Sequence, residues 1–354
     1  MTSVRLGIVT SGSVGWKTVR KRWETDLSDY DPRHFHIEDY CKAICGFTER
    51  FGAKSVGHSL AGRAAVRAAI DAGANVILMS TLQNAPLIPA EAKVAYLIYG
   101  DCTTSQLTQL YGGKPLGFPG SWITSQLNGV AKNQSYFLCT SEWFGDALRA
   151  EFEIPQDRIV TLPFYVDTAK WKPAAKRDRA RFNALFIGGD LARKGCDIVH
   201  AMAAMDDFQD VDFHIVSPNA VQSGDNVHAY RSMTADSDDL VRLVQKCDVM
   251  VLPTRADTSS HVALEASACE LPVITTRCGA IPEIVLDQIT GSIVPSADLS
   301  LFAEELAKYR DDATLVASRG KDARRHVEKN FSKSRHMATL RNVIETAAVR
   351  AQML

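Results

Sequence analysis

Short apolar runs alternate with helical stretches along most of the chain. Each run has the length of a buried β-strand, and polar or glycine-containing turns follow it. The runs are Val4–Thr10, Asn75–Met79, Val94–Tyr99, Tyr136–Cys139 and Ile159–Leu162 in the first half, and Asn183–Ile187, Phe213–Val216, Val227–Tyr230, Val249–Leu252 and Pro272–Thr275 in the second. Strands that alternate with helices in this way predict parallel sheets with helices on both faces.

The helical stretches and the length of the chain predict two domains. Helices are expected at Leu60–Ala72, Glu142–Phe152, Cys196–Met205, Asp236–Cys247, Leu299–Tyr309, Asp312–Asn330 and Lys333–Leu354. A chain of 354 residues is too long for one ordinary core. The composition becomes rich in Lys and Arg between Thr168 and Arg181, as in an exposed linker. We therefore predict α/β domains over residues 1–168 and 169–332, followed by a last helix over 333–354.

Composition and charge describe a soluble globular protein. Hydrophobic residues make up 46% and charged residues 23%, and the net charge of −1 gives no support for nucleic acid as a partner. No apolar run reaches the roughly 20 residues of a membrane span, and we see no signal peptide. The eight cysteines are scattered without a C-x-x-C pair. We expect reduced thiols in a cytoplasmic protein and no metal site.

The stretch from Asp248 to Val294 predicts an anion site. The strand Val249–Leu252 ends at Pro253, a polar loop runs from Thr254 to Ser260, and a helix begins near His261. The carboxyl end of a parallel strand, followed by a helix N-terminus, is where α/β proteins bind nucleotide phosphates. Two carboxylates flank this place, Asp257 in the loop and Glu265 two helical turns further on.

A second loop of the same kind follows the strand Asn183–Ile187. It reads Gly188-Gly189-Asp190-Leu191-Ala192-Arg193-Lys194-Gly195. Its glycines let the backbone approach a ligand, and Arg193 and Lys194 offer positive charge for a diphosphate.

Several residues of the first half allow two interpretations. Asp101 follows a strand, where it either caps the helix beginning near Thr104 or belongs to an active site. The turn Ser11–Gly15 does not match G-x-G-x-x-G, so it is either a tight turn or a phosphate site. His34 and His36 share one face of a short strand, as part of an exposed surface or as metal ligands.

A basic helix raises the question of membrane contact. It carries Lys17, Arg20, Lys21 and Arg22 together with Trp16, Val19 and Trp23. Such a helix either lies on an anionic membrane surface or presents a solvated face. Trp122 is a second, weaker hint of a lipid acceptor.

Motifs in the second half resemble, in order, those of the large retaining group of GT-B-fold glycosyltransferases called group 1, or family four. Phe186–Gly195 resembles the glycine-rich loop ending in Lys-Gly, and Asp248–Pro253 resembles the "aDvfvlPs" strand. Asp257–Glu265 resembles the E-x7-E motif, with Asp in place of the first Glu. The remaining similarities are Leu271–Val273, Gly279–Glu283, Thr290-Gly291 and, in the first half, Ser141–Trp143 and Pro163–Asp167.

The resemblance implies two Rossmann-like, doubly wound domains that face a central cleft. The first would bind an acceptor and the second a nucleotide-sugar donor, and the last helix would cross back to the first domain. The implied reaction moves a sugar from a nucleotide-diphosphate sugar, UDP- or GDP-linked, to an acceptor hydroxyl with retention of configuration. It requires no cofactor and no metal.

The resemblance also implies roles for individual residues. Lys194 and Arg193, beside Gly188 and Gly189, would neutralise the donor's diphosphate. The backbone N–H groups of Ser259, Ser260, His261 and Val262 would hold the distal phosphate or sugar hydroxyls. Asp257 would contact the donor sugar and Glu265 the ribose, and Asp101 would lie near the acceptor.

Departures from the family pattern leave the specificity open. Asp257 is one methylene shorter than Glu, Ser260 replaces a Gly, and Gly189 stands where Arg is usual. A sugar-nucleotide epimerase on the same fold and a non-catalytic nucleotide-sugar-binding protein are the alternatives. A glycan, a lipid, a protein or a small molecule could be the acceptor. The sequence does not determine the oligomeric state.

Overall fold

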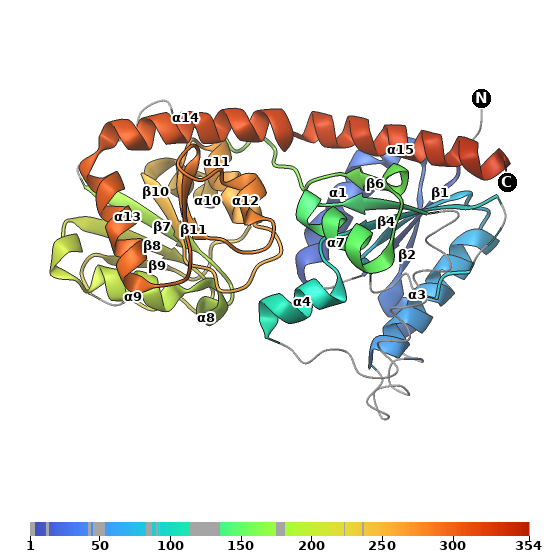
Figure 1. Cartoon of the computed structure of the whole chain (residues 1–354), viewed down its shortest axis with the longest axis horizontal. Helices are drawn as coiled ribbons and strands as arrows, with labels where there is room; N and C mark the ends of the chain where they lie inside the picture. Colours follow the sequence, from blue (N-terminus) through green and yellow to red (C-terminus); the bar gives the residue numbers. More distant parts are fainter. Residues whose placement is uncertain are drawn as a thin grey trace. The chain divides into compact units, whose positions relative to one another are not determined.

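The computed structural model contains two units, each built on its own parallel sheet (Figure 1). It describes residues 4–11, 14–41, 44, 54–82, 87–89, 91, 93–112, 135–174, 181–222, 224–235 and 237–353. The predicted turn around Gly12, Trp122 and the linker residues 175–180 lie outside this set. One unit comprises Met1–Pro163 with His336–Leu354, and the other comprises Phe164–Arg335.

The first unit has a six-stranded sheet in the order β2-β1-β3-β4-β5-β6, with all strands parallel. The strands are β1 (Leu6–Thr10), β2 (Arg33–His36), β3 (Val76–Ser80), β4 (Ala95–Gly100), β5 (Ser135–Cys139) and β6 (Ile159–Thr161). Helices α1 (Val14–Asp26), α3 (Lys54–Asp71), α4 (Thr104–Tyr111) and α7 (Glu142–Phe152) connect them. The strand order reverses direction between β1 and β3, as in a doubly wound fold.

The second unit has a six-stranded parallel sheet in the order β12-β11-β10-β7-β8-β9. The strands are β7 (Phe182–Ile187), β8 (Val211–Val216), β9 (Val227–Tyr230), β10 (Val249–Leu252), β11 (Val273–Thr276) and β12 (Gly291–Val294). Its helices are α8 (Leu191–Lys194), α9 (Cys196–Ala203), α10 (Asp238–Lys246), α11 (His261–Ala268), α12 (Ile281–Ile284), α13 (Leu299–Asp311) and α14 (Ala313–Asn330). Counted from β7, this is the 3-2-1-4-5-6 order of a Rossmann sheet, with its switch point between β7 and β10. The predicted α/β fold with two doubly wound units is confirmed.

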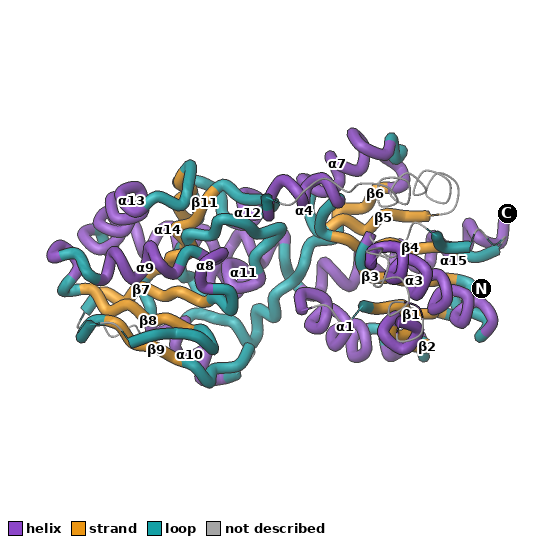
Figure 2. Tube along the Cα trace, turned by 90° about the horizontal axis from the view of Figure 1, so that it is seen from below, coloured by secondary structure: helices purple, strands orange, loops and turns teal. Residues whose placement is uncertain are grey.

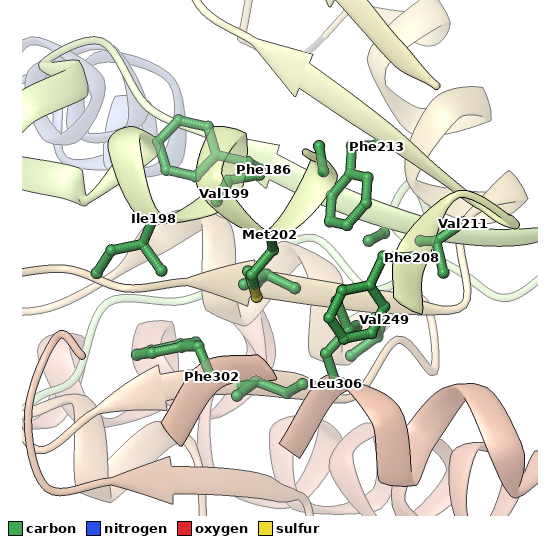
Figure 3. Packing of buried hydrophobic residues seen from close by; sticks show 14 of the residues in the cluster. Phe186, Ile198, Val199, Met202, Phe208, Val211, Phe213, Val249, Phe302 and Leu306 are labelled. Atoms are coloured by element: carbon green, nitrogen blue, oxygen red, sulfur yellow. The ribbon is translucent and has the colours of Figure 1, made fainter. Parts of the chain in front are cut away.

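Within each unit the strands form one layer and the helices lie outside it (Figure 2). In the second unit, Phe186, Met202 and Phe302 are completely buried where α9 and α13 cover one face of the sheet. Figure 3 shows these side chains with their neighbours in one apolar cluster. This packing fixes β7 and α9, between which the loop Gly188–Gly195 runs.

Every strand predicted from the apolar runs is present, with ends within two residues of the prediction. The structure adds β12, α8 and α12, which the sequence pattern did not predict. Each is only four residues long. The helices α8 and α12 are too short to show a period of 3.6 residues. The strand β12 begins with Gly-Ser, so it lacks the apolar run that identified the other four-residue strands β10 and β11.

The final helix α15 (Lys333–Met353) returns to the first unit, as the fold class implies. His336 Nδ1 donates to the Pro163 carbonyl at 2.7 Å. Arg341 forms an ion pair with Asp29 and donates to the Asp26 carbonyl at 3.0 Å. These bonds hold α15 against the carboxyl end of α1 and the segment beyond it.

The apolar face of α1 is part of the core of the first unit. Trp16 and Trp23 are 7% and 2% exposed, and their rings lie 5.5 and 5.6 Å from the ring of Tyr99. The two tryptophans therefore pack inside the unit and are not available to insert into a membrane surface. Lys17 and Lys21 are exposed. No helix within the described ranges is long and apolar enough to cross a membrane.

Cysteines and metals can be assessed for the described residues. Cys102, Cys139, Cys196, Cys247, Cys269 and Cys278 are free thiols. Cys41 is disulfide-bonded, so the prediction of reduced cysteines is wrong at that position. No group of three or more His, Cys, Asp or Glu side chains in the described parts of the chain is arranged to hold a metal ion.

A buried histidine joins three strands of the second sheet. The His214 ring lies within hydrogen-bond distance of Tyr230 Oη, 2.9 Å from Nδ1, and of Asn183 Oδ1, 2.8 Å from Nε2. Asn183 donates its own amide to the Arg181 carbonyl, so its Oδ1 is the acceptor for the Nε2–H of His214. Burial lowers the pKa of His214 to about 4, and burial likewise lowers the pKa of His336 in the first unit to about 4.

We predict that acid destabilises both units through these histidines. The unfolded chain takes up a proton on each as the pH falls below about 6.5, whereas the folded chain does so only near pH 4. The stabilisation is complete above pH 6.5 and falls by about 1.4 kcal/mol per histidine and pH unit between these values. Chemical denaturation between pH 7.5 and 4.5 measures it. His214→Gln should flatten the pH dependence, whereas an unchanged slope would contradict the assignment. His228→Gln should flatten it less, because burial is the main cause of the lowered pKa of His214 and the neighbouring His228 ring only adds to it.

Candidate functional site

Two loops predicted separately to bind anions lie side by side at the switch point of the second sheet. β7 and β10 are paired, with Val249 opposite Ala184 and Met250 opposite Leu185. The loop Gly188–Gly195 leaves the carboxyl end of β7, and the loop Pro253–Ser260 leaves that of β10. Ligands of open α/β sheets bind in the crevice at such a switch point.

Arg255 fastens the two loops to each other. Its backbone N–H donates to the Arg193 carbonyl at 2.8 Å, and its guanidinium donates to the Ala192 carbonyl at 2.6 Å. The same guanidinium binds both carboxylate oxygens of Asp197 at 2.7 Å. These hydrogen bonds lower the pKa of Asp197 and raise the pKa of Arg255. The relative position of the loops is thus fixed by the protein itself.

A cation and a carboxylate meet where the loops touch. Lys194 Nζ donates to Asp257 Oδ2, and the side chains of the two residues are only 12% and 10% exposed. Arg193 donates to the Ala256 carbonyl at 2.6 Å and places Nη1 3.9 Å from Asp257 Oδ1. The predicted residues Arg193, Lys194 and Asp257 therefore form one cluster, although 63 residues separate Lys194 from Asp257.

Gly188 and Gly195 leave the space that Lys194 needs to reach Asp257. The short helix α8 begins with the Asp190 carboxylate accepting from the Arg193 N–H and ends at Gly195, which has φ +79°. A Cβ at Gly195 would lie 2.1 Å from the Pro253 carbonyl oxygen. A Cβ at Gly188 would lie 3.0 Å from the Cβ and Cγ of Lys194. Gly189 meets nothing within 4 Å.

A third loop, which follows β11 and contains Cys278 and Gly279, holds the backbone of Asp257. The Asp257 N–H donates to Cys278 Sγ at 3.1 Å, and the Cys278 thiol donates to the Asp257 carbonyl at 3.5 Å. Burial raises the pKa of Cys278, so this thiol keeps its proton. Gly279, with φ +50°, leaves room for the Asp257 carbonyl, which would lie 2.2 Å from a Cβ there. Sequence reasoning missed Cys278, and its place beside the Gly-Ala-Ile-Pro-Glu motif was the available signal.

The helix α11 supplies the predicted backbone donors. Ser260 is its N-cap, and its hydroxyl accepts from the Ala263 N–H at 3.3 Å. The preceding N–H groups of the first turn, including Val262, have no intrahelical acceptor. The His261 ring packs on Phe164 at 4.5 Å, and Ser259 and Glu265 are half-buried. These residues follow Asp257 directly, on the loop and helix that continue from it.

Asp101 belongs to the first unit, just beyond β4. The interpretation of Asp101 as a helix cap is wrong, because Thr103 caps α4 and forms a capping box with Gln106. The Asp101 carboxylate is half-buried, with the Cys102 Sγ 3.7 Å from its Oδ1. Its participation in an active site stays a prediction.

The two histidines of β2 are half-buried, so the interpretation of an exposed strand face is wrong. His36 lies 3.1 Å from Thr10 Oγ1 and 2.9 Å from the Arg20 guanidinium. Arg20 in turn donates to Glu24 at 3.0 Å. His36 therefore belongs to a hydrogen-bonded chain that joins β1, β2 and α1.

We predict that Gly195→Ala destabilises the second unit by about 2 kcal/mol or more, because the left-handed backbone and the Pro253 carbonyl both exclude a Cβ. The free energy of unfolding from urea denaturation measures the effect. Gly189→Ala is the matched control and should change stability by less than about 0.5 kcal/mol. Equal effects of the two substitutions would contradict the tight contact at Gly195.

Comparisons with known proteins agree with this geometry. The family described as Glycosyl transferases group 1 matches residues 181–312, which hold the three loops of the site. A D-inositol 3-phosphate glycosyltransferase of Saccharomonospora viridis is 38% identical over 93 residues, which are 26% of this chain and 21% of that protein. The MMP alpha-(1->4)-mannosyltransferase of Mycolicibacterium hassiacum is 25% identical over 255 residues, which are 69% of this chain and 62% of that protein. The chain thus spans less than two thirds of the length of these relatives.

The fold as a whole has solved counterparts. HepE of Anabaena, solved in complex with UDP, superposes with a TM-score of 0.69 at 12% identity. The superposition covers 97% of this chain and all of the other. The chain therefore has the GT-B fold of two Rossmann-like units, and residues 181–312 of its second unit match the family of group 1 glycosyl transferases.

Proposed function

We propose that the protein transfers a sugar from a nucleotide-diphosphate sugar to an acceptor hydroxyl with retention of configuration. One observation carries the proposal. Lys194 and Arg193 meet the carboxylate of Asp257 at the switch point of a group 1 glycosyltransferase unit. Two cations on one loop match the charge of a diphosphate, and a carboxylate beside them matches sugar hydroxyls or developing positive charge on the sugar.

The leaving group is the centre of the proposed mechanism. The bond between the anomeric carbon and the phosphate oxygen breaks, and negative charge grows on the diphosphate. Lys194 and Arg193 stabilise that charge beside the nearly buried side chain of Asp257, and poor solvation strengthens such stabilisation. The acceptor oxygen attacks the same face of the sugar, and its proton passes to the leaving phosphate. Asp257 stabilises the oxocarbenium-like charge, and no metal is required.

The remaining residues of the site hold the donor in place. The backbone at Gly188 and Gly189 approaches the diphosphate, since neither residue has a side chain in the way. The N–H groups from Ser259 to Val262 bind the distal phosphate or sugar hydroxyls at the N-terminus of α11. Glu265, one helical turn further on, accepts from the ribose hydroxyls.

The relatives and solved structures bear on the donor base and the acceptor. HepE was solved with UDP, which supports a UDP-sugar, and a GDP-sugar fits the same diphosphate clamp. The names of the two relatives indicate different acceptors, D-inositol 3-phosphate and MMP. We assign the acceptor to the first unit, with Asp101 near the reacting hydroxyl.

A screen of UDP-, GDP- and ADP-sugars by thermal shift tests the proposal. A ligand that binds only the folded chain stabilises it by about 2.7 kcal/mol at 100 times its Kd. We expect one of these nucleotide series to raise the melting temperature and the others not. Calorimetry without detectable binding of any nucleotide diphosphate or its sugar at millimolar concentration would contradict the proposed function.

We predict that Lys194→Ala lowers kcat about 100-fold or more, because one preorganised charge-stabilising group contributes on that scale. Hydrolysis of the donor identified by the screen is a sufficient assay. Lys308→Ala is the control, since that lysine lies on α13, is 49% exposed and pairs with Glu304 and Glu305. Unchanged turnover in Lys194→Ala would remove this residue from the mechanism.

A further inference from the structure

The cation assigned to the donor's diphosphate already has an anionic partner in the protein. Lys194 Nζ is bonded to Asp257 Oδ2, and both side chains are nearly buried. An ammonium in this position cannot be solvated freely, so the carboxylate supplies the charge compensation that water supplies at the surface. The site therefore contains a complete ion pair before any ligand arrives.

A diphosphate and the Asp257 carboxylate cannot both bind the Lys194 ammonium at the same position. Two anions held against one cation within a poorly solvated site repel each other strongly. A carboxylate that leaves Lys194 still has a cation close by, because Arg193 Nη1 lies 3.9 Å from its other oxygen. Arg193 is itself held by the Ala256 carbonyl at 2.6 Å, so it stays beside Asp257.

The backbone around Asp257 is fixed, so the exchange involves the side chain alone. Cys278 bonds to both the N–H and the carbonyl of Asp257, and the Thr258 carbonyl accepts from the Ala280 N–H at 2.9 Å. The carbonyl of Thr254 accepts from the Thr276 hydroxyl at 2.5 Å. A rotation about the side-chain bonds of Asp257 is therefore the available motion, and a shift of the loop is not.

We propose that Asp257 is the resident counterion of Lys194 and that the distal phosphate of the donor displaces it. The displaced carboxylate then turns to the donor sugar. Binding of the diphosphate and presentation of the carboxylate become one event, so a ligand without a distal phosphate leaves Asp257 engaged. The proposal rests on the proposed function, because it requires a nucleotide diphosphate as the ligand.

Binding of nucleotides that lack a sugar tests this exchange. Calorimetry with UDP and UMP, or GDP and GMP if the protein prefers guanine, compares the wild type with Asp257→Asn. The variant should bind the diphosphate about tenfold more tightly, a change of 1.4 kcal/mol, because the competing charge is gone. Its affinity for the monophosphate should change by less than about twofold, because a monophosphate has no distal phosphate to displace Asp257. Turnover of the donor sugar should fall, because the carboxylate that meets the sugar is lost.

Matched variants separate the exchange from general effects of charge. Asp239→Asn removes the same charge at an exposed pair with Arg242 and should leave both affinities unchanged. Asp257→Glu keeps a carboxylate and should not tighten diphosphate binding. If thermal unfolding shows that Asp257→Asn is not folded, Asp257→Ser serves as a second variant without the carboxylate.

The outcomes distinguish this inference from the proposed function. Unchanged or weaker diphosphate binding in both Asp257→Asn and Asp257→Ser would overturn the exchange, and so would an equal gain for the monophosphate. A wild-type protein that binds no nucleotide diphosphate at millimolar concentration would overturn the proposed function itself. A wild type that binds diphosphate while the variants bind it no better would leave the proposed function standing.

Discussion

The pairing of β7 with β10 is the constraint on which the site depends. The strands β7 (Phe182–Ile187) and β10 (Val249–Leu252) are far apart in the sequence, and their parallel pairing brings the loops beyond them to one edge of the sheet. The two loops approach each other so closely at Gly195 that a Cβ there would overlap the Pro253 carbonyl. Arg255 then ties the loops together through three groups of the neighbouring loop and helix. The two loops therefore keep a fixed position relative to each other, which is what the proposed phosphate site requires.

Electrostatics decides what this fixed geometry can do. A lysine and an aspartate that are each about nine-tenths buried compensate each other, since either charge alone would be poorly solvated. Such a pair contributes little net stability, because desolvation offsets most of the attraction. Its value lies in function. The pair keeps a cation and a carboxylate at the place where, in our proposal, a diphosphate leaves and positive charge develops on a sugar.

The first unit is organised by packing rather than by charge. Trp16, Trp23 and His336 surround Tyr99, so α1, β4 and α15 share one aromatic cluster. The burial that lowers the pKa of His336 also makes this cluster sensitive to acid. Because the tryptophans of α1 face inward, Lys17, Lys21, Glu24 and Thr25 are the exposed side chains among those described in that helix. Any contact of this helix with an anionic surface would therefore rely on Lys17 and Lys21.

The sequence by itself determined the strands, the longer helices, the two doubly wound units and the residue types of both anion loops. These features follow from local patterns, because a buried strand must be apolar and a phosphate loop needs glycine and cations wherever it lies. Only the tertiary structure decided which side chains touch. The pairing of Lys194 with Asp257, the support from Cys278 and the capping role of Thr103 instead of Asp101 depend on strand register and backbone angles. The tertiary structure alone also showed α8 and β12, because a single helical turn has no period to recognise and β12 begins with Gly-Ser instead of an apolar run.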